Sequence, residues 1–449
     1  MSRKTLLLAL LLASSLVLAL ARNSAAQADF DYRADPPRVQ VSSGAAPHQI
    51  VLPFCPTASG TVICYAPPFL QLAYNFPFDL DGTGQTILVV DAFGSPTIQN
   101  DLAVFDSVFG IPDPPSFTIY CPEGCPPYNP HNHHVEAGWA AETTLDVEYA
   151  HAMAPGANIV LVVAATSTGN AVHTAEAAAI KRYPGSIMTQ SFGVPEILIR
   201  GNKGQISQAE KNYLAAQAAG ITVLASTGDL GATNGFSIAN AQFPASDPLV
   251  TAVGGTQGDP YPGGLLGCDP VAQTCTYTYG GEQVWNEPAI GAAGGGAPSF
   301  LFGVPSYQSG LTLDGSPLTS RTVPDVSYNA AYDGGVLVYL TFLGPANAGF
   351  YLVAGTSAAT PQWASIFALV NQCRANHSNG PLGFANSAIY ALAQTSAYTT
   401  DFHDITVGNN QLVGTPVGFS AVTGWDAGSG WGTPNVTNLV SDLAGTTCP

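Results

Sequence analysis

The stretch TILVVDA, residues 86–92, decides the fold that we expect for this chain. It is apolar without alternation up to Asp91, a pattern typical of a strand that helices cover on both faces. Four further runs share this composition: residues 158–164, 186–193, 221–229 and 249–256. Helical patterns separate several of the runs: residues 99–109, 134–152, 169–182 and 207–219. The alternation predicts an α/β domain with a parallel sheet and helices on both faces.

The composition is that of a folded, loop-rich protein. Of 449 residues, 46% are hydrophobic and only 9% are charged, whereas disorder needs low hydrophobicity and high charge. The net charge is −18, with only 12 Lys and Arg, which argues against nucleic acid as a partner because such binding depends on basic side chains that neutralise phosphate. The sparse basic complement suits either solubility or tolerance of acid, where most carboxylates are neutral.

The first residues have the pattern of a secretion signal. Arg3 and Lys4 precede an apolar run over residues 6–21, and an AQA sequence at residues 26–28 has the form of a cleavage site. We therefore expect residues 1–28 to be a signal peptide and the protein to be secreted, without a membrane anchor after cleavage. An uncleaved anchor is the alternative, because the apolar run is slightly long.

Eight cysteines in an exported chain predict disulfides. Proximity along the chain favours three local pairs and leaves the last two cysteines for each other: Cys55–Cys64, Cys121–Cys125, Cys268–Cys275 and Cys373–Cys448. This is one of 105 possible pairings. The spacing in CPEGC, residues 121–125, also occurs at zinc sites, but no second pair or suitably spaced histidine completes one.

A candidate nucleophile lies in LVAGTSAATPQWASIF, residues 352–367. A turn of small residues runs into a helical pattern, which puts Ser357 at a helix N-terminus, near free backbone N–H groups. Such a serine is either a helix cap or a nucleophile, and a nucleophile requires a base elsewhere in the chain. The histidines of HNHHVEAGW could supply a base together with Asp91, as in a subtilisin-like enzyme: His131, His133 and His134.

A pair of carboxyl groups is the other candidate base. In AAETTLDVEYAHAMAPGA, Glu142 and Asp146 are four residues apart and share one face of a helix. Two close carboxyls split their pKa values, which gives a base that works in acid, where a histidine is already protonated. A solvated acidic face is the alternative, but the apolar surroundings predict a helix packed against the sheet. In VLASTGDLGATNG, a protonated Asp229 at a strand end could donate a hydrogen bond to an oxyanion.

In this order, GTSAATP, ETTLDVEYAHAMAPGA and ASTGDLG resemble the sedolisin, or serine-carboxyl peptidase, family. The resemblance extends from about residue 65 to residue 445. It implies a subtilisin-like fold in one large catalytic domain, monomeric, that cleaves protein or peptide substrates in acid, either internally or as a tripeptidyl peptidase. It also implies four roles: Ser357 as nucleophile, Glu142 as general base, Asp146 as the group that orients the base, and Asp229 as the oxyanion-hole acid. In TQSFGVPE, which resembles the family's substrate-cleft strand, Ser191 and Gly193 would bind an extended peptide through backbone groups.

The resemblance further implies one structural calcium ion near the C-terminus, where the family pattern reads DITVGNN and AVTGWDAGSGWGTPN. Calcium takes six to eight oxygen ligands, and the implied ones are the side chains of Asp404 and Asp426 and the carbonyls of Ile405, Val422 and Gly424. Such an ion would hold the C-terminal loop and take no part in chemistry.

Residues 29–64 depart from the family, whose members carry a large N-terminal prodomain. A segment of 36 residues is too short for such a domain. We therefore expect three parts: residues 1–28 as signal peptide, residues 29–64 as a short N-terminal segment, and residues 65–449 as the sedolisin-type domain with its calcium loop. Two alternatives stay open: the subtilisin-like protease with a histidine base, and a catalytically inactive, calcium-stabilised secreted binding protein on the same fold.

Overall fold

The computed structural model describes the following parts of the chain: residues 29–42, 54–57, 60–129, 135–261 and 277–448. The expected signal peptide, the three candidate histidines and the Cys268–Cys275 pair lie outside the described residues.

An eight-stranded sheet forms the centre of the molecule, in the order β12-β11-β9-β7-β4-β6-β5, with β17 also paired to β11. Its strands are β4 (Thr86–Ala92), β5 (Phe117–Tyr120), β6 (Asn158–Ala164), β7 (Ile187–Gln190), β9 (Thr222–Ser226), β11 (Thr251–Gly258), β12 (Glu282–Val284) and β17 (Val326–Asn329). Neighbouring strands are parallel except β11 and β12. The predicted parallel sheet is therefore confirmed, although β7 ends at Gln190 and residues 191–193 leave the sheet.

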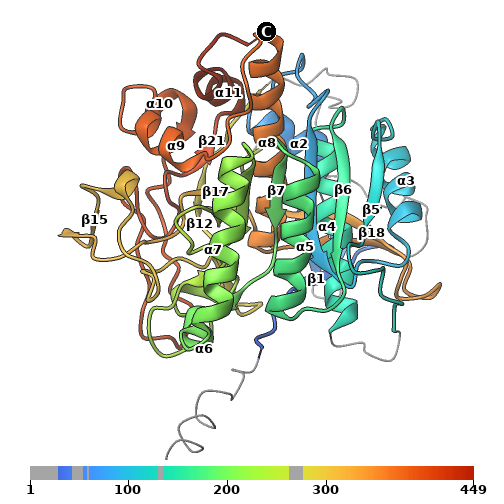
Figure 1. Ribbon diagram of the computed structural model, residues 1–449, viewed down its shortest axis with the longest axis horizontal. Helices are drawn as coiled ribbons and strands as arrows, with labels where there is room; N and C mark the ends of the chain where they lie inside the picture. The colour runs from blue at the N-terminus through green and yellow to red at the C-terminus, as the bar shows by residue number, and fades with distance from the viewer. Residues whose placement is uncertain (1–28, 43–53, 58–59, 130–134, 262–276, 449) are drawn as a thin grey trace, which may run out of the picture.

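Two layers of helices cover this sheet, as predicted (Figure 1). On one face, α5 (Gly169–Arg182) and α7 (Lys203–Ala218) lie side by side in front of the strands in Figure 1. On the other face, α4 (Glu136–Met153) packs against α8 (Thr356–Asn376), and α3 (Ile98–Phe109) packs against α4. All of α4 is buried, because it also contacts a second sheet through β18.

The sequence did not indicate this second sheet, which has the order β1-β19-β18-β3-β2. Its strands are β1 (Arg38–Gln40), β2 (Phe54–Thr57), β3 (Gly60–Tyr65), β18 (Gly335–Leu340) and β19 (Gly349–Val353). The smaller elements are α2 (Pro67–Ala73), β8 (Val194–Pro195), α6 (Glu196–Ile199), β10 (Gln242–Phe243), β13 (Asn286–Glu287), β14 (Ala292–Ala293), β15 (Thr312–Leu313), β16 (Ser316–Pro317), α9 (Asn386–Ala393), α10 (Tyr398–Asp401), β20 (Phe402–His403), β21 (Thr433–Pro434) and α11 (Val436–Ala444).

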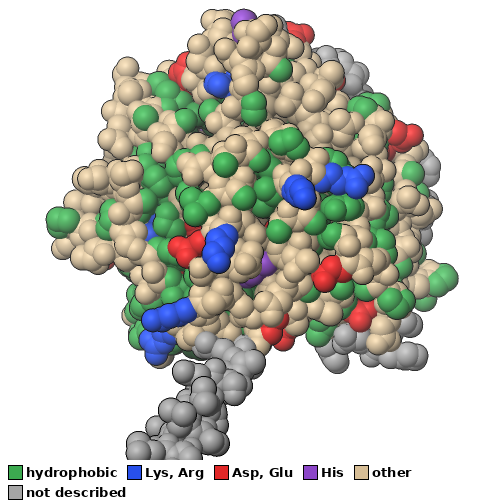
Figure 2. Space-filling view, in the orientation of Figure 1, with side chains coloured by type: hydrophobic (Ala, Val, Ile, Leu, Met, Phe, Trp, Pro, Cys, Tyr) green, Lys and Arg blue, Asp and Glu red, His purple; other side chains and the backbone are tan. Residues whose placement is uncertain are grey.

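Three of the four predicted disulfides are present, and the fourth lies outside the described residues: Cys55–Cys64, Cys121–Cys125 and Cys373–Cys448. On the face shown in Figure 2, charged side chains are scattered over a largely uncharged surface. Among the helices that the structure describes, none is long and apolar enough to cross a membrane.

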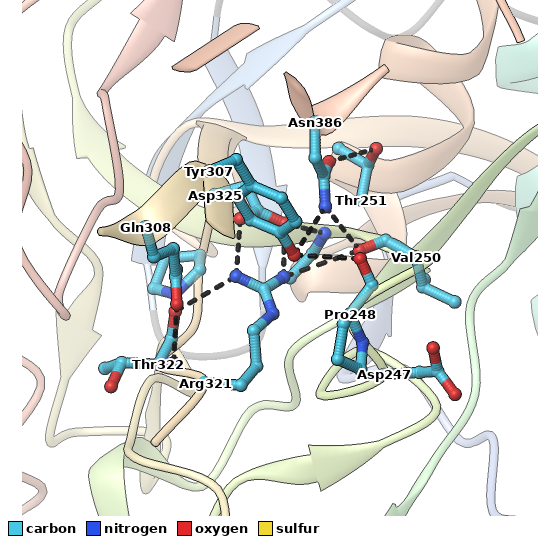
Figure 3. Close-up of polar contacts among 12 residues, drawn as sticks. Asp247, Pro248, Val250, Thr251, Tyr307, Gln308, Arg321, Thr322, Asp325 and Asn386 are labelled. Atoms are coloured by element: carbon cyan, nitrogen blue, oxygen red, sulfur yellow. Dashed lines mark hydrogen bonds and ion pairs between the residues drawn. The ribbon is translucent and has the colours of Figure 1, made fainter. Parts of the chain in front are cut away.

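A buried ion pair ties the loop before β17 to the sheet (Figure 3). Both Arg321 and Asp325 are 0% exposed, and the guanidinium donates two parallel hydrogen bonds of 2.6 and 2.5 Å to the carboxylate. The backbone N–H of Ala252 and the hydroxyl of Tyr390 also donate to Asp325. Burial opposes the charge of Arg321, but the adjacent carboxylate outweighs this effect and raises the pKa of Arg321.

Replacing Arg321 by Met should therefore destabilise the protein strongly, by about 3–5 kcal/mol, because the carboxylate of Asp325 would stay buried without its cation. The free energy of unfolding, measured with denaturant, tests this. Arg200→Met removes an exposed arginine and should change stability by less than about 0.5 kcal/mol. The double variant with Asp325→Leu should recover part of the loss. Equal stability of Arg321→Met and the natural protein would contradict the argument.

Candidate active site

The ends of two parallel strands, β7 and β9, converge on one cleft. In open α/β sheets, ligands bind beyond the carboxyl ends of the strands, where the strand order reverses. Here the order reverses at β4, and the residues after β7 and β9 line a cleft of about 640 Å³. Glu142, Ser191, Gly193, Asp229 and Ser357 all line this cleft. Five candidate residues from distant segments therefore meet at one place, and Asp146 adjoins Glu142.

Ser357 is not the cap of its helix. The cap position of α8 belongs to Gly355, and Ser357 is the second residue of the helix. Its hydroxyl points toward two acceptors, Glu142 Oε2 at 3.1 Å and the carbonyl oxygen of Ser191 at 3.2 Å. Because the side chain bonds to a carboxyl rather than to the free N–H groups of its own helix, the geometry favours the interpretation as a nucleophile over a helix cap.

Three carboxyl groups lie next to one another behind Ser357. Glu142 and Asp146 are consecutive on the same face of α4, and Asp91 at the end of β4 adjoins Asp146. All three are 0% exposed. Among the described residues no Lys, Arg or His forms an ion pair with any of them. Buried charges without partners are costly, which favours the protonated forms of these carboxyls.

Burial is the largest effect on this carboxyl cluster, and it raises the pKa of Asp91, Glu142 and Asp146 well above their usual range. For Glu142 the neighbouring charges of Asp146 and Asp91 raise the pKa further, while the hydroxyl of Ser357 lowers it in part. The hydroxyl of Ser191 and the side chain of Glu142 act in the same lowering sense on Asp146. Within the cluster, Oε2 of Glu142 is the oxygen that accepts a hydrogen bond from Ser357 Oγ.

Asp229 also lines the cleft and is partly exposed. Its Oδ1 accepts hydrogen bonds from the N–H of Thr356 at 2.8 Å and from the Thr356 hydroxyl at 2.9 Å. Removal of solvent raises the pKa of Asp229 to about 6, although these two bonds lower it in part. In a mildly acidic solution the group is therefore neutral and its Oδ2 can carry a hydrogen-bond donor.

Gly355 permits this contact between Asp229 and the start of α8. Its φ is +120°, and a Cβ at this position would lie only 2.7 Å from Oδ2 of Asp229. A larger residue would meet both strain and a collision. Thr356 is a site residue that the sequence did not reveal, since nothing in GTSAATP indicates that a threonine hydroxyl contacts a carboxyl in the loop after β9.

The five residues expected to bind calcium lie on two adjoining loops. Tyr398 donates to Asp404 Oδ1 at 2.8 Å, and Asp426 lies near the same tyrosine. The N–H of Gly424 also donates to Asp404. Within the described loops, the carbonyl oxygens of Ile405, Val422 and Gly424 accept no hydrogen bond. No cluster of three or more His, Cys, Asp or Glu side chains suited to a metal occurs among the described residues.

Comparisons with known proteins identify the class of protein to which this fold and this cleft belong. Residues 123–432 match the model described as the subtilase family. Kumamolisin from Bacillus sp. (strain MN-32) is 31% identical over 86% of this chain and 64% of its own length. Sedolisin from Pseudomonas sp. (strain 101) is 32% identical over 53% of this chain and 37% of its own. Mouse tripeptidyl-peptidase 1 is 30% identical over 53% of this chain and 40% of its own.

Among solved structures, Pseudomonas sedolisin, a serine-carboxyl proteinase complexed with two molecules of pseudo-iodotyrostatin, has a TM-score of 0.68 at 25% identity. The match covers 85% of this chain and 98% of that one. The chain belongs to the subtilase family, and its relatives assign it to the sedolisin branch, as the motifs indicated. It spans less than two thirds of the length of these curated relatives.

The carboxyl cluster predicts how stability depends on pH. A folded-state pKa raised above the unfolded value means that the folded chain holds extra protons, so stability is greatest below about pH 4 and falls as pH rises through the folded pKa values. Each proton so held is worth about 1.4 kcal/mol per pH unit. The free energy of unfolding, measured between about pH 4 and pH 7.5, should therefore decrease.

The double variant Asp91→Asn/Asp146→Asn should flatten this decrease, because the amides need no proton to be neutral. Glu123→Gln, which changes an exposed carboxyl, serves as control. A pH dependence that persists unaltered in the double variant would contradict the assignment to the cluster.

Proposed function

We propose that this protein is an acid-acting serine-carboxyl peptidase that hydrolyses peptide bonds through Ser357. The observation that carries the proposal is the hydrogen bond of 3.1 Å from Ser357 Oγ to Glu142 Oε2. Ser357 Oγ attacks the carbonyl carbon of a peptide while Glu142 accepts its proton. Asp146 orients Glu142 and shares a proton with it. Glu142 then returns the proton to the leaving amine, and water releases the acyl group by the same route.

Asp229 would stabilise the oxyanion formed by this attack. Protonated, it would donate from Oδ2, and the backbone N–H of Ser357 would supply a second donor. Its pKa of about 6 favours the neutral, donating form in acid. Both the carboxyl pair that acts as the base and the oxyanion donor would therefore function best at low pH.

A subtilisin-like mechanism with a histidine base is the competing proposal. In it Asp91 would orient an imidazole, whereas Asp91 here adjoins a second buried carboxyl, Asp146. A base must contact Ser357 Oγ, and the carboxyl group that makes this contact is that of Glu142. These contacts favour the carboxyl mechanism.

The inactive binding protein is the other alternative, and Ser357→Ala separates it from an enzyme. The variant should lose at least ~10⁴-fold in kcat on a denatured protein at about pH 4. Glu142→Gln should lose about 10²–10⁴-fold because the general base is gone. Ser309→Ala, at an exposed position, should behave like the natural protein. If neither the natural protein nor Ser357→Ala yields cleavage products between about pH 3 and 5, the proposal that the protein is an enzyme is wrong.

The pH profile tests the oxyanion acid separately. The value of kcat/KM should fall as pH rises through about 6, where Asp229 loses its proton. Asp229→Asn keeps a donor at every pH, so its profile should lack this fall, at the expense of about 10²–10³-fold in rate if the amide is imperfectly placed. A rate that instead rises between about pH 5 and 7 would indicate a histidine base.

We also propose how the chain is organised and exported. Residues 1–28 would direct secretion, residues 29–64 would form the short N-terminal segment, and residues 65–449 would form the monomeric peptidase domain. The three disulfides described are consistent with an exported protein. Whether cleavage is internal or removes tripeptides would be read from the products of a peptide library.

One calcium ion is proposed at the C-terminal loops. The carboxylates of Asp404 and Asp426 and the three carbonyls that accept no hydrogen bond supply oxygen ligands, the type that calcium takes. When bound, the ion would neutralise two neighbouring carboxylates and fix both loops without contacting the cleft.

Calcium should therefore stabilise the fold. At ~100 times the dissociation constant a specific ligand adds about 2.7 kcal/mol, so the melting temperature should rise on addition of calcium and fall with a chelator. Asp426→Asn should weaken this response, while Asp314→Asn, in the β15–β16 turn, should not alter it. An equal response to magnesium, retained in Asp426→Asn, would rule out a specific site.

A further inference from the structure

A segment from the N-terminal region crosses the cleft beside Ser357. Residues 33–37 line the cleft together with Glu142 and Ser357. They are the middle part of residues 29–42, here called the N-terminal strap. No pattern in the sequence predicts this segment at the candidate active site.

The strap is anchored upstream by Tyr32. Its side chain is 1% exposed, and its hydroxyl lies 2.9 Å from Nε2 of His173 on α5. Its ring packs against Phe192 and Phe243, and its backbone N–H donates to the carbonyl of Ser167 at 2.9 Å. This anchor lies at the carboxyl edge of the sheet, beside the cleft.

Downstream, the strap is anchored by β1, which pairs antiparallel with β19. Immediately before this pairing, the carbonyl of Pro37 accepts the N–H of Ala354 at 2.9 Å. Ala354 is three residues before Ser357. The strap is therefore held on both sides of the candidate nucleophile.

Between the anchors, the strap pairs with the segment expected to bind a peptide. Arg33 N–H donates to the Gly193 carbonyl at 3.1 Å, and Gly193 N–H donates to the Arg33 carbonyl at 3.2 Å. This is an antiparallel bridge, the pairing through which extended peptides add to a strand edge. A substrate that uses Gly193 in this way competes with Arg33 for the same two groups.

The strap then passes over the helix that carries the base. A Cβ at Gly138 of α4 would lie 2.7 Å from the Ala34 carbonyl oxygen and 3.1 Å from Asp35 Cβ. Gly138 is one helical turn before Glu142. The next two residues, Pro36 and Pro37, have no N–H, and each carries a ring carbon on the nitrogen that would be the leaving group of a cleavage.

We propose that the N-terminal strap is a built-in pseudosubstrate: it occupies the peptide-binding groove uncleaved, and a peptide ligand gains access by displacing residues 33–37. The proposal rests on the proposed function, since it takes the cleft to be a peptide site. Only the fraction of molecules with the strap displaced binds peptide, so the apparent affinity falls by that fraction. The two prolyl bonds account for the survival of the strap next to its own nucleophile.

Arg33→Pro tests the pairing directly, because proline removes the N–H that donates to Gly193. Arg33→Ala is the matched control, since it removes the same side chain and keeps the N–H. Binding of acetyl-Ala-Ala-Phe-aldehyde to the full chain, measured by calorimetry at about pH 4, should be roughly 3- to 10-fold tighter for Arg33→Pro than for Arg33→Ala or the natural protein. The one-residue probe acetyl-phenylalaninal, which is too short to reach Gly193, should bind all three alike.

Equal or weaker tripeptide binding by Arg33→Pro, with the short probe unchanged, would overturn the pseudosubstrate. Mass spectrometry of the natural protein after incubation in acid should show the strap intact, and cleavage within residues 33–37 would overturn it as well. If neither aldehyde binds any form, the proposed peptidase fails, and amide hydrogen exchange then decides on the strap. The Gly193 amide should be protected in the natural protein and in Arg33→Ala, and faster in Arg33→Pro.

The natural protein alone gives a further test, should Arg33→Pro not fold. Saturation with the tripeptide aldehyde should increase hydrogen exchange at Arg33 and its neighbours in residues 32–35, because the ligand displaces them. The amide of Gly193 should stay protected, now by the ligand. Unchanged exchange in the strap upon saturation would show that it is a fixed wall of the cleft and overturn the proposal.

Discussion

The complete burial of α4 is the constraint on which the rest of the structure depends. This helix lies between the central sheet, α8 and the second sheet, and it holds Glu142 and Asp146 where neither side chain is exposed to solvent. A low dielectric penalises charge, and no cation among the described residues offsets it. Protonation, rather than a lysine or arginine, therefore neutralises these carboxyls. Both the folding and the proposed chemistry of the cleft consequently depend on acid.

The whole composition is consistent with this coupling. With 12 Lys and Arg against 30 Asp and Glu, neutralisation of carboxylates in acid reduces the net charge and its self-repulsion. The buried pair of Arg321 and Asp325 differs from the cleft, because a bidentate contact with a cation stabilises the carboxylate there. Both sites contain buried carboxyl groups, but protonation neutralises those of the cleft, whereas an arginine pairs with Asp325. A cation beside Glu142 would stabilise its charged form and weaken it as a base, whereas Asp325 has only to hold a loop.

The sequence predicted features that depend on local pattern. The apolar run of β4 identified a strand covered on both faces, and the spacing of Glu142 and Asp146 put both on one helical face. The sequence did not predict which strands pair when they are distant along the chain: β1 lies next to β19 although about 310 residues separate them. The contact of Thr356 with Asp229 is of the same kind, since it arises from the closeness of β9 to the start of α8. Such contacts follow from tertiary packing and leave no periodic signal.

The pairing of β1 with β19 also explains how a strap can be both anchored and displaceable. Register is fixed where Val39 faces Leu352, and β19 leads through Gly355 to the helix that carries Ser357, so the downstream anchor and the nucleophile share one rigid support. Upstream of Pro37, the described backbone bonds to the cleft are the two with Gly193. A bound peptide remakes those two bonds, so the exchange leaves no buried donor or acceptor unpaired and costs little beyond the contacts of residues 33–37 themselves. A groove lined by its own chain can thus remain occupied by residues 33–37 and still open locally, without separation of the second sheet.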